Sequence, residues 1–312
     1  MRVAPQSRAA RTPYPPARPP VPQIRYFVFI RPVTPGARAL ATRIAQKHLA
    51  RGLRGVADPA ARAALLAKLS PAYPIGCKRV ITSDDFYPAL AQPHVSLETG
   101  AILRVVPSGV VVADGAGGEA TIPLDVLVYA TGFDVVASID SLGVVGAGGL
   151  SMRRAFELKG GPEAYLGVAA PAFPNMFMMM GPNTGLGHSS MITMIEAQAR
   201  YAAEVIARAR ARVWARVEVK AAVCDAYNKD LQAELRKNVW GSCVSWYNRA
   251  GRRAPAGCPR TRKGAAPNSP LPYSHTNTAV AGAKNVVLWP FTVIAYHWRM
   301  RSVDWSAYDV RA

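Results

Sequence analysis

The stretch that decides the fold runs from Asn175 to Met191 and reads NMFMMMGPNTGLGHSSM. An apolar run meets a Gly-Pro-Asn-Thr-Gly loop, and good helix formers follow from about Ser189 to Arg212. We therefore predict a buried strand, a glycine loop and a helix whose N-terminus faces that loop. The first N–H groups of such a helix carry a partial positive charge, which suits a phosphate or the electron-rich edge of a ring. A tight strand-to-helix turn without a ligand explains the local pattern equally well.

Two well-known loop motifs are excluded by the residues present. A phosphate-binding P-loop requires GxxxxGK[ST], because its lysine reaches the terminal phosphates, but here the loop ends in His188-Ser189. A hydrolase nucleophile elbow requires GxSxG, and the residues from Gly187 to Met191 lack the second glycine. Neither nucleoside triphosphate hydrolysis nor serine hydrolase chemistry is therefore predicted.

A second segment, DVLVYATGFD at residues 125–134, has the composition of a continuous buried strand in a parallel sheet. It ends in the small residues Ala130, Thr131 and Gly132, which let a ligand approach the backbone closely. A core strand followed by a glycine turn is the alternative interpretation.

Shorter segments carry local signals. Asp58 followed by Pro59 predicts a helix start, because aspartate caps the first N–H groups and proline fits the first helical position. The sequence PSGVVVADGAGGEATI at residues 107–122 predicts a β-hairpin with a glycine-rich loop. Residues 218–236 are rich in helix formers, whereas residues 284–300 are strand-like and aromatic.

Composition limits the classes of function. The chain has 312 residues, of which 50% are hydrophobic, so it can bury a sizeable core. Its net charge of +19 is concentrated in residues 1–62, where Asp58 is the single acid, and in Arg249–Lys263. Both segments look unstructured, so we predict nonspecific anion binding but no specific nucleic-acid recognition.

The chain has no apolar stretch of about 20 residues, so we predict no membrane span. It also begins without a secretory signal, and we predict a cytoplasmic protein. An organellar transit peptide is the alternative, because the first residues are rich in arginine and poor in acids.

Four cysteines are widely spaced: Cys77, Cys224, Cys243 and Cys258. They form no CxxC pair and have no histidine at metal-ligand spacing, so no metal site is predicted. Because no secretory signal is present, we expect all four to be reduced thiols.

Two features in the order LVYATGFD and FPNMFMMMGPNTGLGHSSM, together with EAYLG, resemble the C-terminal half of class B flavoprotein monooxygenases. These are the flavin-containing and Baeyer–Villiger monooxygenases. The sequences SWYNR and LWPFTVIAYHWRMRSVDWSAYD are similar to the C-terminal end of that family. The resemblance implies an enzyme with FAD and NADP as cofactors and with O2 and a small organic molecule as substrates. It inserts one oxygen atom into a ketone or a heteroatom.

The resemblance also implies functional residues. The cofactor-binding positions lie at the end of one strand and around the glycine loop, where the family lines the flavin ring: Ala130, Thr131, Gly132, Gly181, Pro182 and Met191. Arg79, in the sequence CKR, matches the position of the Baeyer–Villiger arginine. A guanidinium there would stabilise a negatively charged flavin peroxide and lie against the nicotinamide. Asp84 and Asp85 are candidates to orient it; an ordinary cation at a domain junction is the alternative.

The implied fold class is α/β: an incomplete FAD/NAD(P)-binding Rossmann-like flavoprotein fold, its C-terminal half, with a disordered N-terminal segment and insert. The resemblance divides the chain into a Pro/Arg-rich, largely disordered remnant of the NADPH-domain end (1–35), a helical linker region (36–75), the C-terminal part of an FAD-binding domain (76–249), a low-complexity insert (250–283) and a C-terminal strand segment (284–312).

The family uses two GxGxxG fingerprints, each of which places a pyrophosphate on a helix N-terminus. Neither occurs in this sequence, and GAGG at residues 115–118 lies inside the predicted hairpin. We therefore predict a truncated chain that keeps one wall of the flavin site. The alternatives are a non-catalytic remnant or interaction module of the same fold and a basic nucleic-acid or anion binder.

This departure from the family generates the first prediction. We expect the 312-residue chain alone not to hold FAD tightly, because pyrophosphate contacts supply much of the affinity in dinucleotide sites. The measurement is the flavin absorbance of protein that has been incubated with FAD and desalted. A stoichiometrically yellow protein after desalting would contradict the expectation.

Overall fold

The computed structural model describes part of the chain, and every structural statement below concerns these residues: 35–81, 83–114, 117–132, 142–187, 189–241, 243, 245, 247 and 284–312. The predicted disordered segment at residues 1–35, apart from Pro35, and the predicted insert at residues 250–283 lie outside them.

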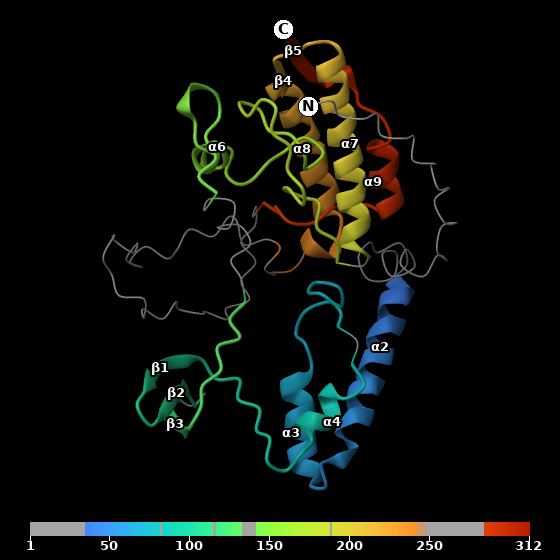
Figure 1. Cartoon of the computed structure of the whole chain (residues 1–312). Coiled ribbons are helices and arrows are strands. Elements are labelled where there is room, and N and C mark those ends of the chain that lie inside the picture. Colours follow the sequence, from blue (N-terminus) through green and yellow to red (C-terminus); the bar gives the residue numbers. More distant parts are fainter. Residues whose placement is uncertain are drawn as a thin grey trace, which may run out of the picture.

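Four helical elements form the first part of the described chain (Figure 1). They are α2 (Pro35–Gly52), the 3-10 helix η2 (Leu53–Gly55), α3 (Pro59–Leu69) and α4 (Phe86–Leu90). The predicted helix start at Asp58 is confirmed, because its carboxylate accepts hydrogen bonds from the N–H groups of Ala60 and Ala61. The short helix α4 packs on the end of α2, where Tyr87 lies against Gly52.

Three antiparallel strands follow: β1 (Ile102–Val106), β2 (Gly109–Ala113) and β3 (Glu119–Pro123), with β2 in the centre. The predicted hairpin is confirmed, since Gly109 pairs with Pro123 and Ala113 with Glu119. The valines of β2 are buried, whereas β1 is mostly exposed. Arg104 of β1 forms a bidentate ion pair with Glu119 of β3 across the central strand.

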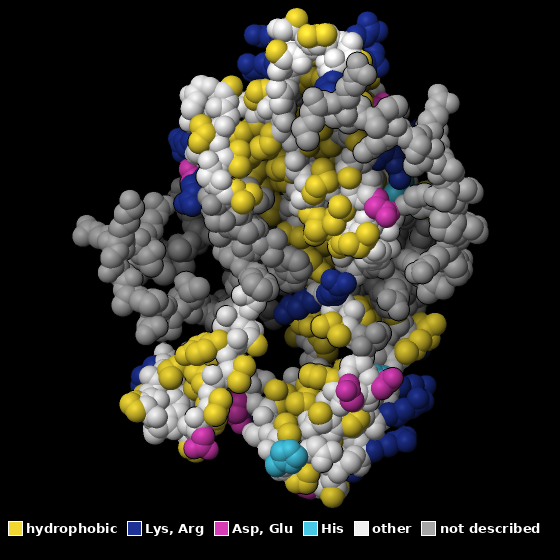
Figure 2. Space-filling view, viewed as in Figure 1, with side chains coloured by type: hydrophobic (Ala, Val, Ile, Leu, Met, Phe, Trp, Pro, Cys, Tyr) yellow, Lys and Arg dark blue, Asp and Glu magenta, His cyan; other side chains and the backbone are white. Residues whose placement is uncertain are grey.

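The segment after β3 differs from its prediction. Residues 124–132 run as an extended chain outside any strand, and their side chains are exposed, with Val126 at 76% and Val128 at 80%. The prediction of a buried strand is therefore wrong for this chain. A parallel strand is buried only when strands pair with both its edges and helices cover both its faces. The described residues place no strand beside it, and Figure 2 shows hydrophobic side chains at the surface in this part of the molecule.

The remaining elements contribute most of the main hydrophobic core and a small satellite cluster. Figure 1 shows their arrangement in space. In chain order they are η3 (Ala147–Gly149), α6 (Met152–Leu158), α7 (Met191–Ala211), β4 (Arg216–Val219), α8 (Ala221–Arg236), η4 (Val239–Gly241), α9 (Val293–Arg299), η6 (Trp305–Ala307) and β5 (Tyr308–Arg311). The long helix α7 agrees with the predicted helix after the glycine loop, and its buried face includes Met194, Tyr201 and Val205.

The C-terminal elements pack on this helix. Strand β5 pairs antiparallel with β4, so that Val217 faces Val310. For this reason the predicted helix at 218–236 begins only at Ala221, as α8. Residues 284–300 are not a strand as predicted: they form an isolated bridge at Leu288 and then helix α9, whose start is capped by Thr292.

The methionine run is also not a strand. Residues 173–180 form an irregular segment, and backbone hydrogen bonds tie it to two other parts of the chain: Met178 donates to the Val168 carbonyl, and Asn175 donates to the Val217 carbonyl. The prediction of a buried strand is therefore wrong here as well. The segment lies between a turn and an edge of the β4–β5 pair instead of inside a sheet.

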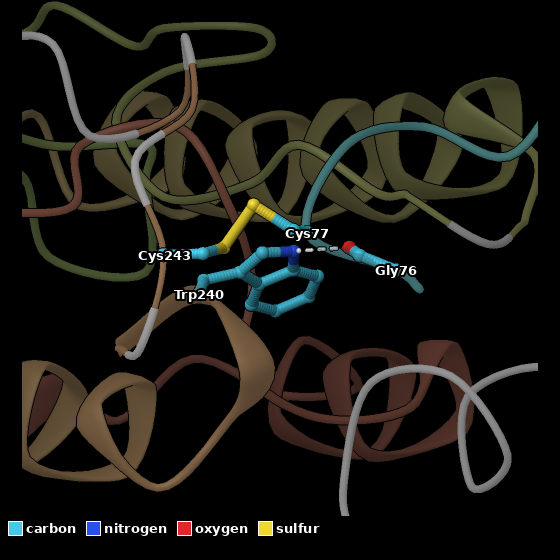
Figure 3. Close-up of a disulfide and its surroundings, with 4 residues drawn as sticks. All are labelled: Gly76, Cys77, Trp240 and Cys243. Atoms are coloured by element: carbon cyan, nitrogen blue, oxygen red, sulfur yellow. Dashed lines mark hydrogen bonds between the residues drawn. A yellow bond between two sulfur atoms is a disulfide. The ribbon is translucent and has the colours of Figure 1, made fainter. Parts of the chain in front are cut away.

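Two of the cysteines are joined in a disulfide. Cys77 and Cys243 lie 166 residues apart in the sequence, and their Cα atoms are 6.1 Å apart (Figure 3). The expectation that these two are reduced thiols is wrong, because sequence spacing does not show which cysteines the fold brings together. Cys224 is free and buried, and burial raises its pKa to about 12. Cys258 lies outside the described residues.

No helix within the described part of the chain is long and apolar enough to cross a membrane.

The exposed segment gives a direct test of this fold. We expect Val128→Asp to change the free energy of unfolding by less than about 0.5 kcal/mol, because its side chain is exposed. The matched control is Val111→Asp in β2, where the side chain is 2% exposed. A charge buried there should cost more than about 3 kcal/mol or prevent folding. Urea denaturation measures both, and a loss above about 1 kcal/mol for Val128→Asp would contradict the observed exposure.

Candidate functional site

The glycine loop is buried and pairs with a segment far along the chain. Gly181, Pro182, Asn183 and Thr184 are all buried. The Asn183 N–H donates to the Val286 carbonyl (2.9 Å) and the Gly185 N–H to the Val287 carbonyl (2.7 Å). The Trp289 N–H in turn donates to the Gly185 carbonyl (2.9 Å). The loop is thus held by residues 286–289 in a parallel bridge.

Gly181 has a structural reason to be glycine. A Cβ at this position would lie 2.2 Å from the Gly167 carbonyl oxygen, so only a residue without a side chain allows the two backbone segments to approach. Gly167, with φ of +69°, is equally constrained, because a Cβ there would lie 2.0 Å from the Thr184 methyl group. The two segments therefore interlock.

A buried amide connects the methionine run to two helices. Gln198 of α7 is completely buried, and its Oε1 accepts a hydrogen bond from the Met180 N–H (2.9 Å). Its Nε2 donates to the hydroxyl of Tyr296 in α9 (3.0 Å), and that hydroxyl donates to the Leu166 carbonyl (2.7 Å). Burial raises the pKa of Tyr296, so the hydroxyl keeps the proton that it donates.

Met191 is the first residue of α7. It is half-buried, and its Sδ accepts a hydrogen bond from the Leu186 N–H (3.1 Å). Ser190, the N-cap residue, makes no side-chain cap, and the first turn carries no acidic residue. Within the described part of the chain, no side chain caps the first N–H groups of this long helix, and such groups attract an electron-rich partner. His188, next to this point, lies outside the described residues.

Arg79 lies on a different segment, two residues after Cys77, and it is exposed. Its charge acts on Tyr247: burial raises the pKa of this tyrosine, and the positive charge of Arg79 opposes the shift. Among the described residues no ion pair joins Arg79 to Asp84 or Asp85. The Asp85 carboxylate accepts a hydrogen bond from the Ser83 hydroxyl instead, which lowers its pKa. No contact among the described residues between Arg79 and either aspartate therefore supports the predicted orienting role of Asp84 and Asp85.

The predicted residues Ala130, Thr131 and Gly132 are exposed, and a Cβ at Gly132 would meet nothing within 4 Å. No hydrogen bond of the described residues joins them to the glycine loop. Met191 contacts the end of the glycine loop at Leu186, while Gly181 follows Met180, whose N–H donates to Gln198 further along α7. The structure leaves Ala130, Thr131 and Gly132, and also Arg79, on separate segments.

The prediction from the sequence did not include two polar residues of this site, Asn183 and Gln198. Asn183 donates from its side-chain amide to the carbonyls of Asn285 (2.8 Å) and Leu288 (3.2 Å), while its Oδ1 is buried without a donor among the described residues. Gln198 stands between Ala197 and Tyr201 on the buried face of α7. A single amide inside an otherwise apolar helix face was the signal that could have identified it.

An open groove of about 480 Å³ lies at the other end of α7, with apolar side chains such as Phe177, Ile206 and Trp214 and the charged Arg210 in its lining. Val205, also in the lining, is about 20 Å from Met191 along the helix axis, at 1.5 Å per residue. The groove contains none of the predicted site residues. The described part of the chain also contains no group of three or more side chains that could hold a metal ion.

The fold matches solved flavoprotein structures. OTEMO in complex with FAD and NADP aligns with 89% of this chain at a TM-score of 0.67 and 21% identity, which is 45% of that chain. Oxidised steroid monooxygenase bound to NADP aligns with 89% of this chain at 0.65 and 22% identity, which is 46% of that chain. The protein therefore has an incomplete α/β fold of the flavoprotein monooxygenase class.

Proteins of similar sequence are named more specifically than this structural class. A Baeyer–Villiger monooxygenase of Pseudomonas aeruginosa is 39% identical over 215 residues, which are 68% of this chain and 38% of the relative. A Baeyer–Villiger monooxygenase of Streptomyces coelicolor is 33% identical over 279 residues, which are 88% of this chain and 45% of the relative. No protein-family model matches the chain. The chain is thus a relative of the Baeyer–Villiger monooxygenases and spans less than half of their length.

The interlocked glycines give a prediction for the site. We expect Gly181→Ala to lower the free energy of unfolding by about 1–3 kcal/mol in protein without added cofactor, because the methyl group would strike the Gly167 backbone. The matched control is Gly36→Ala in α2, where a Cβ meets nothing within 4 Å. It should be neutral or stabilising by up to about 1 kcal/mol. Equal melting temperatures for the two variants would contradict the packing role of Gly181.

Proposed function

We propose that this chain supplies the flavin-ring side of an FAD- and NADPH-dependent monooxygenase that inserts one atom of O2 into a ketone or heteroatom compound. The observation that carries the proposal is the 39% identity to a Baeyer–Villiger monooxygenase over 68% of the chain. Because the chain spans 38% of that relative, the proposal concerns the contribution of these 312 residues to the activity.

The start of α7 supports a ring-shaped ligand. Its N-cap residue Ser190 makes no side-chain cap, so the first helix N–H groups are donors. In the glycine loop, the buried Asn183 Oδ1 is an acceptor without a donor among the described residues. The pyrimidine end of a flavin presents both carbonyl oxygens and an N–H group, so it can pair with both kinds of partner. Gly181, Pro182, Asn183 and Met191 would hold the ring there.

Arg79 supports the catalytic part of the proposal. It is exposed, and no described carboxylate pairs with it, so its positive charge is available to an anionic group. A guanidinium keeps its charge at every physiological pH and offers several donors in one plane. In the proposed site Arg79 would hold negative charge beside the flavin and orient the nicotinamide.

The bound flavin would take a hydride from NADPH and activate O2. The chain itself would bind and orient the ring through the buried glycine loop and provide the Arg79 charge. No GxGxxG sequence occurs in residues 1–312, so we assign the ring side, and not the pyrophosphate contacts, to this chain.

The second candidate is a non-catalytic module of the same fold. Two observations favour it. Gly181 is explained by packing against Gly167 without any cofactor. The end of the segment at Ala130–Gly132 is exposed, and no hydrogen bond of the described residues joins it to the glycine loop.

An oxygenation assay separates the two candidates. With FAD in excess, NADPH and 18O2, we expect the protein to form one-atom oxygenated products from a panel of cyclic ketones and sulfides. We expect Arg79→Ala to lower the rate at least about 100-fold, as removal of a charge-stabilising group does, and Arg79→Lys to retain part of it.

The control is Arg54→Ala, which removes another exposed arginine, on η2, and should leave the rate unchanged. Product mass spectrometry and NADPH consumption are the measurements. An absence of labelled product at saturating FAD would favour the non-catalytic module. Equal rates for Arg79→Ala and Arg54→Ala would remove Arg79 from the proposed site.

A further inference from the structure

The Cys77–Cys243 disulfide joins the segment between α3 and α4 to the region just after η4. Cys77 lies on the irregular segment between α3 and α4, which belong with α2 and η2. Cys243 comes two residues after η4, which packs with α8. The bond closes a loop of 166 residues, and the Cys77 side chain is fully buried at the junction.

Contacts beside the disulfide also hold the Cys77 segment against η4 (Figure 3). The Trp240 Nε1–H of η4 donates to the Gly76 carbonyl (3.2 Å), and Trp240 itself is buried. The turn that presents this carbonyl has Gly76 at φ of +90°, a conformation that favours glycine, and the Cys77 N–H donates to the Pro74 carbonyl (3.1 Å). Tyr73 packs against the main core.

The chain passes from a buried to an exposed position directly after Cys77. Lys78, Arg79 and Val80 are all exposed. Two residues span at most about 7 Å of chain, so the location of Cys77 limits where the Arg79 backbone can lie. Arg79 is also close enough to Tyr247, beyond Cys243 in sequence, for its charge to act on the tyrosine hydroxyl.

We propose that the Cys77–Cys243 pair is a redox-sensitive tether that fixes the Arg79 segment against the η4 end of the main core. In the oxidised state the disulfide holds residues 73–80 in place. In the reduced state the remaining contacts are the Trp240 hydrogen bond and the packing of Tyr73. The tether itself is independent of the proposed function. Only its meaning for catalysis, as a device that positions Arg79, rests on that function.

The chemistry is thiol–disulfide exchange. A dithiol reductant gives two electrons and two protons to the S–S bond, which becomes the thiols of Cys77 and Cys243 while the reductant closes to its own disulfide. A small-molecule disulfide such as oxidised glutathione reverses the step and leaves as two thiols. Cys224 does not compete, because burial keeps its thiol protonated and the thiolate is the attacking species.

The first test shows whether the bond forms. Trypsin places the three described cysteines in separate peptides, at residues 69–78, 221–229 and 238–249. After equilibration of the full chain in glutathione redox buffers and alkylation, mass spectrometry should find peptides 69–78 and 238–249 cross-linked, in a fraction that falls as the buffer becomes reducing. No cross-link in the oxidising buffer, or a cross-link to peptide 221–229 instead, would overturn the proposal.

The second test shows whether the bond positions the segment. Brief native trypsin treatment attacks the bonds after Lys78 and Arg79 in proportion to how often the segment opens. We expect cleavage there to be about tenfold faster in Cys243→Ala than in oxidised wild type, with Cys224→Ala as the matched control that stays at the wild-type rate.

Reduced wild-type protein gives the same comparison without a substitution, so a poorly folded variant does not decide the outcome. Rates at Lys78 and Arg79 that are equal in oxidised and reduced protein would overturn the tether. Because neither test requires flavin or turnover, their outcome is distinct from that of the oxygenation assay. A tether without oxygenation would leave the crosslink as a property of the non-catalytic module.

Discussion

The buried amide of Gln198 holds together the parts from which the site is built. It accepts from the backbone of the methionine run and donates to Tyr296, whose hydroxyl reaches the Leu166 carbonyl. Loss of the amide would leave the part-buried Met180 N–H and the buried Tyr296 hydroxyl without this partner, and a hydrogen bond of this kind is worth about 1 kcal/mol. One side chain of α7 thus fixes the approach to the glycine loop, the turn beneath it and helix α9. The register of these three segments depends on it.

Around that amide, backbone packs directly on backbone. Gly181 and Gly167 leave no room for a side chain, and Gly185 lies against the Val287 carbonyl, 2.7 Å from where a Cβ would be. A loop built this way is rigid, which suits a surface that must present N–H groups to a ligand ring at a fixed angle. The same rigidity would serve a module that binds no ligand. For this reason the glycines alone do not distinguish the two functions.

Local sequence patterns correctly predicted the structures that depend on short-range interactions. The Asp58 cap, the hairpin of β2 and β3 and the long helix α7 all follow from short-range chemistry, and the structure has them. Burial and pairing could not be predicted from composition. Residues 124–132 have the sequence of an inner strand, but a strand becomes inner only through its neighbours. The partners of the glycine loop and of Cys77 lie more than 100 residues away, and no local pattern points to them.

The pairing of the loop with residues 286–289 has a consequence for synthesis. Asn183 lies 105 residues before Leu288, so the loop leaves the ribosome about 5–20 s before its partner does. During that interval the glycine loop lacks the backbone of residues 286–289 with which it pairs. The nascent chain therefore carries the glycine loop without its backbone partner until residues 286–289 have been synthesised. The speed of translation over residues 190–289 therefore sets how long the loop stays without its partner.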